Sequence, residues 1–397
     1  MIDHFKPFNR QTCDLCGICF HLCPVMQLDK DEARNEIARL IGGHETRHVL
    51  KKCTACFACN FICPHECNPT ALIIERWHEK IVQQGLPLRA GYFVPTMREN
   101  FRTYVVDRLP VQDKALLKQW EDSSPCEEVF YPGCNWITQP HLARTSLLDG
   151  LSIRGSLELC CGETLYRTGL YEEARRQGRK VVDYYHNMGV NLMVIPCAAG
   201  LNMFKNVLPK VFGIKPRFEV QHLLFWLMEK IDSGRIKLGK IDSMKVTIQE
   251  SCYAKLFGKE FMDLPRRLLD IMGMKVVEES LCRDKALCCG IGGGFSPSAG
   301  YHPINITLSG IKSLQMARAT KAEALAVYCA GCLQMLSLAQ IAYPVPFLPI
   351  YHILELLQMA IGEVPQRKHM ARAWTTLLGV ARNQLPALLS GKRIYLG

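Results

Sequence analysis

Two short cysteine runs near the start of the chain constrain its fold more than any other feature. Both read C-x2-C-x2-C-x3-C-P, with Pro24 closing the first run and Pro64 closing the second. In this spacing three thiolates of one run hold a cubane [4Fe-4S] cluster, and the fourth cysteine ligates the neighbouring cluster. The runs therefore predict two cubane clusters with crossed ligands, one on Cys13, Cys16, Cys19 and Cys63, and one on Cys53, Cys56, Cys59 and Cys23.

A zinc site and a disulfide framework are the two other interpretations of these cysteines. Zinc modules pair one C-x2-C with a distant second pair, and disulfide frameworks are typical of small secreted chains. Neither fits two tandem runs in a chain of 397 residues that opens MIDHFKPFNRQTC, without the apolar segment of a secretory signal. We therefore expect an intracellular iron-sulfur protein that transfers electrons.

Apolar and charged residues are distributed in a way that argues against two further classes of protein. The most apolar stretch, residues 335–357, is interrupted by Pro344, Pro346 and Pro349, so we expect buried core there and no transmembrane span in this chain. The net charge is +11, but the basic residues are scattered, which argues against nucleic-acid binding. A docking surface for an acidic or membrane-associated partner agrees better with this charge.

The ends of the chain are predicted to be helical. Apolar residues recur at helical spacing over residues 30–41 and 70–84, so residues 1–95 are expected to form a mostly helical domain. Residues 96–125 are expected to connect this domain to the rest. Residues 366–397 form a basic, partly amphipathic C-terminal segment. We expect this segment to contain a helix that packs on the core, with docking to a membrane surface or a partner as the alternative.

An internal repeat occupies the remainder of the chain, as residues 126–240 and residues 241–365. Four motifs return in the same order at offsets of 118, 128, 132 and 130 residues. The first copy contains Cys134, Cys160-Cys161-Gly162, Cys197 and His222, and the second contains Cys252, Cys288-Cys289-Gly290, Cys329-Ala330-Gly331-Cys332 and His352. The small drift in the offsets indicates two copies of one domain with loop insertions.

Each copy shows the pattern of an α/β domain. Short runs rich in β-branched or aromatic residues precede Cys134, Cys197, Cys252 and Cys329, and helical segments lie between them. Because sites in parallel sheets form outside the carboxyl ends of the strands, the cysteines of a copy should converge. The predicted fold class is therefore α/β plus mostly α: a helical two-cluster domain followed by two tandem α/β domains.

The combination of motifs resembles a known family. A single cysteine, then C-C-G, then C-x-x-C is similar to the cysteine-rich CCG domain found in the B and D subunits of heterodisulfide reductase. Two ferredoxin-type runs followed by two such domains resemble the D subunit over essentially the whole chain. The same domain occurs in iron-sulfur subunits of anaerobic glycerol-3-phosphate dehydrogenase, of glycolate oxidase and of membrane redox complexes of sulfate reducers.

This resemblance implies a noncubane [4Fe-4S] cluster wherever a CCG domain has five cysteines. The second copy supplies five, as candidate catalytic residues: Cys252, Cys288, Cys289, Cys329 and Cys332. In the first copy Gly200 occupies the fifth position, which leaves four candidate metal ligands: Cys134, Cys160, Cys161 and Cys197. Four thiolates suit a zinc ion or a different cluster, and an empty site agrees with the sequence equally well.

Five further cysteines and histidines have structural interpretations. Cys67, Cys126 and Cys282 fall outside the motifs and are expected to be spare or structural thiols. His222 and His352 occupy matching positions in the two copies, but each begins an apolar helix. We expect both to pack against or cap that helix and not to bind metal.

The resemblance implies an electron-transfer subunit of a membrane-associated anaerobic respiratory complex, cytoplasmic and peripheral on the inner face of the cell membrane. Its partner would be a membrane cytochrome b or a quinone-reactive subunit, with disulfide/dithiol chemistry at the noncubane cluster. The alternative is the electron-transfer subunit of a flavin-dependent glycerol-3-phosphate or hydroxy-acid dehydrogenase. A flavoprotein subunit would then be a partner, because no flavin motif is visible, and cytochrome c is a further candidate. A third interpretation is a metal-binding scaffold that holds partners together.

Overall fold

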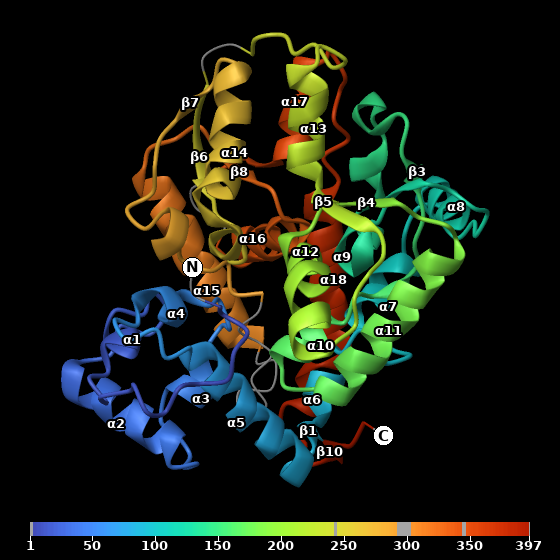
Figure 1. The fold of residues 1–397 in the computed structure, drawn as a ribbon. Coiled ribbons are helices and arrows are strands. Elements are labelled where there is room, and N and C mark those ends of the chain that lie inside the picture. The colour runs from blue at the N-terminus through green and yellow to red at the C-terminus, as the bar shows by residue number, and fades with distance from the viewer. Residues whose placement is uncertain (1–2, 242–243, 292–302, 344–346, 397) are drawn as a thin grey trace.

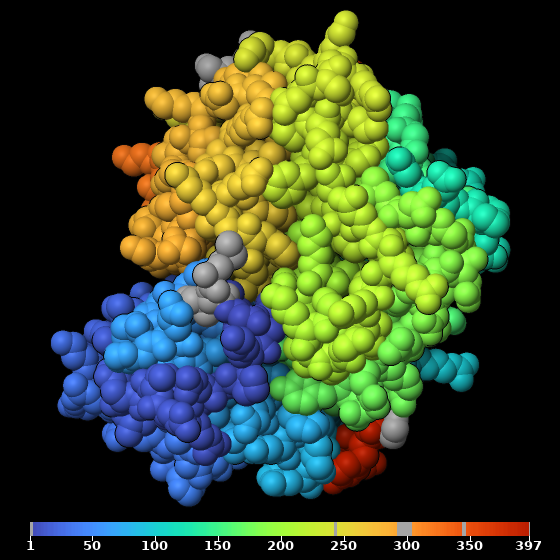
Figure 2. All heavy atoms as spheres, in the orientation of Figure 1, coloured from blue at the N-terminus to red at the C-terminus, as the bar shows by residue number. Residues whose placement is uncertain are grey.

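The computed structural model describes residues 3–241, 244–291, 303–343 and 347–396. A group of helices from the N-terminal residues, blue in Figure 1, lies beside two α/β units. The first unit is green and the second is yellow to orange. Figure 2 shows the blue helices in direct contact with the first unit, and the hydrogen bond between His78 Nδ1 and the Gly169 carbonyl, at 2.7 Å, joins these two parts.

The N-terminal part is helical, as predicted. Asp29 caps its second helix by accepting a hydrogen bond from the Glu32 N–H at 2.8 Å, and Pro69 opens the fifth helix at a position where no backbone donor is needed. Both helices expected from the sequence are present within one residue of their predicted bounds. The helices of this part are α1 (Ile18–His21), α2 (Lys30–Ile41), α3 (Val49–Lys52), α4 (Ala58–Ile62) and α5 (Pro69–Gln84).

The segment that follows is more ordered than its sequence indicated. It contains β1 (Leu86–Pro87), α6 (Leu88–Gly91), α7 (Phe101–Val106) and α8 (Val111–Trp120). The fully buried Asp113 of α8 accepts hydrogen bonds from Arg144 at 2.9 Å and from Arg372 at 2.5 Å. Since a buried carboxylate is stable only when it is paired, these bonds tie the segment to the first unit and to a C-terminal helix.

The two α/β units contain equivalent sheets. Each has four parallel strands, in the orders β3-β2-β4-β5 and β7-β6-β8-β9, so the second sheet repeats the first strand by strand. The predicted tandem α/β fold is confirmed. The strands are β2 (Glu128–Phe130), β3 (Ser152–Ile153), β4 (Leu192–Ile195), β5 (Glu219–His222), β6 (Lys245–Gln249), β7 (Lys275–Val276), β8 (Ala324–Val327) and β9 (Ile350–His352).

Helices cover both sheets, and the central strands are almost completely buried. In the first unit they are α9 (Gly133–Ile137), α10 (Glu163–Arg167), α11 (Tyr171–Asn187), α12 (Ala198–Asn202) and α13 (Leu223–Asp232). In the second they are α14 (Gly258–Ile271), α15 (Pro303–Ala319), α16 (Ala330–Ala342) and α17 (Ile353–Ala360). The apolar stretch 335–357 is thus divided among α16, β9 and α17, and residues 344–346 lie outside the described residues.

The C-terminal segment folds back across the molecule. Its helix α18 (His369–Asn383) packs against α16 and α7, and β10 (Arg393–Ile394) pairs antiparallel with β1. Trp374 and Leu378 remain exposed on the outer face of α18. The helix therefore packs on the core, as expected, while keeping an apolar outer face. None of the described helices is long and apolar enough to cross a membrane.

Candidate metal centres

Two cavities in the helical N-terminal part collect the cysteines in crossed sets. Three cysteines of one run and the last cysteine of the other line each cavity. The first cavity is bordered by Cys13, Cys16, Cys19 and Cys63, and the second by Cys53, Cys56, Cys59 and Cys23. These are the two sets that the spacing of the runs predicts for a pair of cubane clusters.

The backbone of each run is folded around its cavity. Gly17 and Phe57 occupy equivalent places in the two runs, and both have positive φ angles, 71° and 63°. A side chain at Gly17 would place its Cβ 2.6 Å from the Arg34 nitrogen, so this close approach requires glycine. The Ala55 N–H donates to Cys53 Sγ at 3.3 Å. Such N–H to sulfur bonds stabilise thiolates and tune iron-sulfur potentials.

These thiols are poor acids without a metal. Burial is the main cause that raises the pKa values of Cys19, Cys53 and Cys59, and burial raises the pKa of Cys23 to about 12. Apolar surroundings disfavour the charged thiolate unless a cation compensates it. The two cavities therefore have the chemistry of sites whose sulfur ligands ionise when they bind metal.

The five cysteines of the second copy form one connected group. Cys252 follows β6, Cys288 and Cys289 follow β7, and Cys329 and Cys332 lie at the start of α16. Hydrogen bonding to Cys288, followed by burial, raises the pKa of Cys252, and bonding to Cys289 and then Cys329 raises the pKa of Cys332. The loops after three neighbouring parallel strands therefore bring all five sulfurs together, as expected for the carboxyl edge of a parallel sheet.

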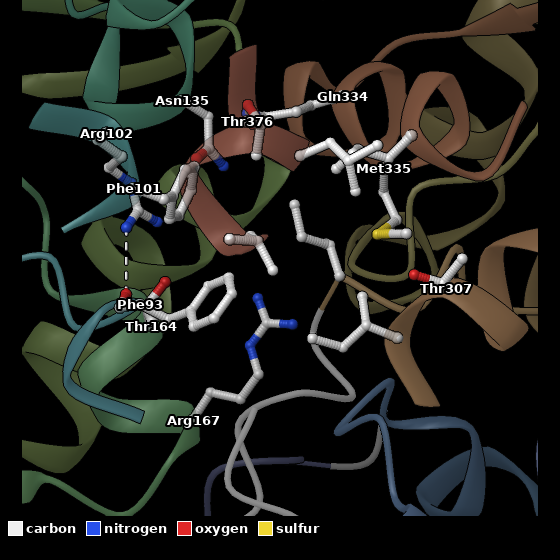
Figure 3. A pocket seen from close by; sticks show the side chains of 15 residues that line it. Phe93, Phe101, Arg102, Asn135, Thr164, Arg167, Thr307, Gln334, Met335 and Thr376 are labelled. Carbon is white, nitrogen blue, oxygen red and sulfur yellow. Dashed lines mark hydrogen bonds between the residues drawn. The ribbon is translucent and has the colours of Figure 1, made fainter. Parts of the chain in front are cut away.

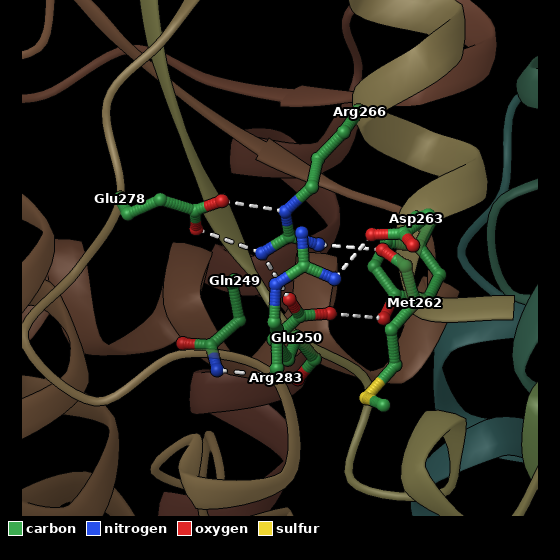
Figure 4. A network of polar contacts seen from close by, with 8 residues as sticks. Gln249, Glu250, Met262, Asp263, Arg266, Glu278 and Arg283 are labelled. Carbon is green, nitrogen blue, oxygen red and sulfur yellow. Dashed lines mark hydrogen bonds and ion pairs between the residues drawn. The ribbon is translucent and has the colours of Figure 1, made fainter. Parts of the chain in front are cut away.

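A polar network holds the loops that carry these cysteines (Figure 4). Arg266 of α14 contacts Glu250 Oε1 and Glu278 Oε1, each at 2.6 Å. Glu250 also accepts a hydrogen bond from the Tyr328 hydroxyl at 2.6 Å, and Gln249 Nε2 donates to the Leu287 carbonyl at 2.8 Å. Since residues of this network lie close to Cys252, Cys288 and Cys329 in sequence, the network positions three of the five sulfurs.

The four cysteines of the first copy are arranged differently. A hydrogen bond with Cys160 is the leading cause that raises the pKa of Cys134, and burial is the second. Cys160 also has a side-chain hydrogen bond with Cys161. The pKa of the Cys197 thiol, however, is raised chiefly by a hydrogen bond with Cys329 of the second copy. The structure thus brings three of the predicted ligands together and places the fourth beside the other centre.

The second N-terminal cavity adjoins the cysteines of the second copy. Cys56 shares one small apolar cluster with Cys288 and Cys252, and Val25 and Ile62 pack against it. The ring of Phe57, which directly follows Cys56, lies with its centroid 5.5 Å from that of Tyr253, which directly follows Cys252. The two sets of cysteines therefore adjoin each other within one apolar cluster.

Sequence reasoning missed two buried arginines at these centres. The side chain of Arg167 is 6% exposed and pairs with Glu163 at 2.8 Å, while the Tyr253 hydroxyl donates to Glu163 as well. Burial alone lowers the pKa of Arg167, but the charges of Glu163, Cys252 and Cys288 outweigh burial and raise it above its usual range. A lone arginine in helix α10 carries no motif, so only the folded structure could place it there.

Arg102 is the other arginine, and it comes from α7 in the connecting segment. It is 3% exposed, its Nη1 donates to the Phe93 carbonyl at 3.2 Å, and its guanidinium lies 4.3 Å from the Phe101 ring centroid. The positive charge of Arg102 lowers the pKa of Cys134, whereas the hydrogen bond with Cys160 and burial raise it. Both sets of CCG thiols therefore have an arginine beside them that favours the thiolate.

A cavity of about 110 Å³ lies between the two copies, next to both arginines (Figure 3). Its walls include Asn135, Ile291 and Gln334, each of which is two residues or fewer from a cysteine of the two sets. Figure 3 shows the Arg167 guanidinium directed into this space. The cavity is thus bordered by residues that lie next to the cysteines of both copies.

The two histidines have the capping role expected for them, whereas Cys67 also borders the first N-terminal cavity. Nδ1 of His222 accepts a hydrogen bond from the Leu224 N–H, and His352 caps its helix in the same way, both at 3.3 Å. The buried Cys67 contacts the Thr12 hydroxyl at 3.3 Å. In the described part of the chain, then, these two histidines cap helices.

Two family models match the chain. One, described as a 4Fe-4S dicluster domain, matches residues 6–64. The other, described as a cysteine-rich domain and named CCG, matches residues 129–205 and 246–337. These ranges contain both cysteine runs and the cysteine sets of both copies. By fold and by ligand sets, the chain is an iron-sulfur protein built from a dicluster domain and two cysteine-rich domains.

The chain is similar to the D subunit of heterodisulfide reductase over most of its length. It is 27% identical over 400 residues to the D subunit of the dihydromethanophenazine:CoB–CoM heterodisulfide reductase of Methanosarcina barkeri, a match that covers 88% of this chain and 94% of that protein. The corresponding protein of Methanosarcina mazei is 26% identical with the same coverage. The chain therefore resembles this D subunit over most of its length, as its motifs predicted.

A longer relative shares part of this arrangement. The EtfAB:quinone oxidoreductase of Syntrophomonas wolfei is 27% identical over 264 residues, which cover 61% of this chain and 36% of that protein. The match thus spans about a third of the length of this relative. Together the relatives identify the chain as an electron-transfer iron-sulfur protein.

Proposed function

We propose that the chain is the electron-transfer subunit of a membrane-associated anaerobic respiratory complex, on the inner face of the cell membrane. The observation that carries the proposal is the contact between the second N-terminal cavity and the second copy, where Cys56, Cys288 and Cys252 share one apolar cluster. Adjacent metal centres in dry surroundings are what a chain of electron carriers requires. The partner would be a membrane cytochrome b or a quinone-reactive subunit.

The proposal assigns the cysteine sets as follows. Two cubane clusters bind in the N-terminal cavities and a noncubane [4Fe-4S] cluster binds to the second copy, and when bound they supply one-electron transfer. The chain's own residues prepare these sites: Arg167 and Arg102 compensate thiolate charge, and Val25 and Ile62 exclude water between the second cavity and the second copy. Disulfide/dithiol redox chemistry is proposed at the second copy. For the first copy, the sulfurs of Cys134, Cys160 and Cys161 are the proposed metal ligands.

A second candidate function is considered because the chain is also similar to a protein named EtfAB:quinone oxidoreductase, a name that mentions no disulfide. In this case the chain would serve a flavin-dependent dehydrogenase, for glycerol 3-phosphate or a hydroxy acid, through a separate flavoprotein subunit. Both candidates use the same three cluster sites in this chain. They differ in the partner.

The test is to extract the native protein anaerobically from membranes in mild detergent, and to identify bound partners by mass spectrometry and haem absorbance. We expect a membrane cytochrome b. A flavoprotein dehydrogenase in its place would support the second candidate. Recovery of the chain with intact clusters but without any redox partner, at detergent concentrations that keep other respiratory complexes together, would contradict both.

A further inference from the structure

The cavity between the two copies is mainly apolar. Phe93 and Phe101 stand on one side of it, with ring centroids 5.6 Å apart, and Met335, Leu377 and Val380 line other parts of its wall. These residues come from three separate parts of the chain: the segment before and at the start of α7, helix α16, and helix α18. The cavity is thus built by tertiary packing and not by one loop.

Two deeply buried polar atoms on its walls have no hydrogen-bond partner. Arg102 is 3% exposed, and its Nε–H is unsatisfied. Gln334 is 2% exposed; its Nε2 donates to Thr376 Oγ1 at 2.9 Å, but its Oε1 accepts no bond. Unsatisfied buried donors and acceptors are rare and destabilising. An unused donor and an unused acceptor on one cavity indicate a ligand that accepts a hydrogen bond and, in one of its states, donates one.

The cavity is too small to enclose a whole cofactor. Its volume of about 110 Å³ compares with on the order of 300–1,000 Å³ for pockets that enclose drug-sized ligands, so it accommodates one ring. Helix α16 lies against both α15 and α18. Both flanking helices expose apolar pairs at helical spacing: Ile304 and Leu308 on α15, and Trp374 and Leu378 on α18. An apolar tail leaving the cavity would find apolar surface on either side.

We propose that this cavity binds the ring of a quinone-class carrier, a planar ring with two oxygens and an apolar tail. The proposal rests on the electron-transfer function proposed above and adds a ligand site in this chain itself. The ring packs against Phe93 and Phe101. One ring oxygen accepts a bond from Arg102 Nε–H, and the hydroxyl of the reduced form donates to Gln334 Oε1. The tail lies over Trp374 and Leu378.

Carbon surface and hydrogen-bonding groups, with one compensated arginine, suit a neutral ring. Arg167 is already paired with Glu163 at 2.8 Å. Arg102 has no ion pair with a carboxylate in the described part of the chain; its Nη1 donates to the Phe93 carbonyl at 3.2 Å, and its guanidinium lies 4.3 Å from the Phe101 ring centroid. One of the two guanidinium charges is thus compensated by a carboxylate, and the rest of the described wall offers a neutral ring hydrogen bonds and carbon surface.

The experiment uses the full chain, purified anaerobically with its clusters, and the quinol analogue 2-heptyl-4-hydroxyquinoline N-oxide, whose fluorescence is quenched on binding. We expect one site per chain and displacement by menadione. Val380→Trp, which places an indole in the cavity, should abolish binding. Gln334→Leu should weaken it about fivefold, the effect of one lost hydrogen bond.

Gln340→Leu is the matched control. Gln340 also lies on α16, is 3% exposed and has an unsatisfied Oε1, but it does not line the cavity. Its substitution should leave binding of the analogue unchanged. Should Val380→Trp not fold, the pair Gln334→Leu and Gln340→Leu decides, with cluster spectra and thermal midpoints confirming that both variants are intact.

Three results would overturn the proposal: no quenching by wild type, equal effects of Gln334→Leu and Gln340→Leu, or displacement of the analogue by glutathione disulfide and not by menadione. The proposed electron-transfer function fails separately. Clusters that are intact and reduced by dithionite, without analogue binding, would refute only the cavity assignment. A chain that assembles no clusters under anaerobic conditions would refute the proposed function itself.

Discussion

Substitution of Arg167 by methionine should destabilise the tandem α/β units strongly. The side chains of Arg167 and Glu163 are 6% and 3% exposed, and their charged atoms lie 2.8 Å apart. Removing one partner of such a buried pair leaves an uncompensated charge, which costs about 3–5 kcal/mol. For a cooperative unit of roughly 150–250 residues, 1 kcal/mol corresponds to about 2–4 °C in thermal midpoint. The expected decrease is therefore about 6–20 °C.

Scanning calorimetry of the anaerobic protein would measure this decrease, with Arg175→Met as the matched control. Arg175 also pairs with a glutamate at 2.7 Å, but the side chains of Arg175 and Glu172 are 59% and 77% exposed. Surface pairs contribute about 0–1 kcal/mol, so the control should lose little. The double variant Arg167→Met/Glu163→Gln should recover more than half of the loss. Equal midpoints for Arg167→Met and Arg175→Met would refute the reasoning.

Three further predictions concern single residues. Cys332→Ser should remove the electron paramagnetic resonance signal assigned to the second copy, while both cubane signals remain. The control Cys282→Ser, which lies outside all ligand sets, should change no signal. Unchanged spectra for Cys332→Ser would contradict the ligand assignment. Gly200→Cys adds a thiol on a Cβ that would lie 4.0 Å from Cys197 Cβ, so we expect more iron or zinc per chain by elemental analysis. An unchanged content would mean that Cys197 and the added thiol do not join the other three sulfurs of the first copy. Burial and then the charges of two other glutamates raise the pKa of Glu279 to about 8 from 4.5. Its carboxyl is therefore held protonated in the folded state, and stability is lost as pH rises from about 4.5 to 8, by at most roughly 1.4 kcal/mol per pH unit. In denaturant titrations, Glu279→Gln should stabilise the protein increasingly as the pH rises over that range. The control Glu278→Gln should destabilise the protein at neutral pH, because Arg266 lowers the pKa of the carboxyl that is removed. A Glu279→Gln effect independent of pH would show that Glu279 does not titrate there.

Much of the organisation of this chain could be predicted from local sequence patterns. Helices α2 and α5 follow from the spacing of apolar residues, and the repeat of Cys197 as Cys329 correctly indicated two equivalent α/β units. The connecting segment was predicted least well. Its Asp113 and Arg102 have meaning only through partners far away in sequence, so periodicity could not reveal that the segment is part of the core.

The sequence alone determined the crossed cysteine sets, the repeat of the α/β unit and the absence of a fifth cysteine at Gly200. These features depend on spacing along the chain, which the printed sequence shows directly. Only the tertiary structure decided that Cys197 lies beside Cys329, that Cys56 lies beside Cys288, and that two arginines border the cavity between the copies. The physical reason is that each of these contacts joins separate units, and packing between units depends on the shape and charge of whole surfaces, which no local pattern encodes.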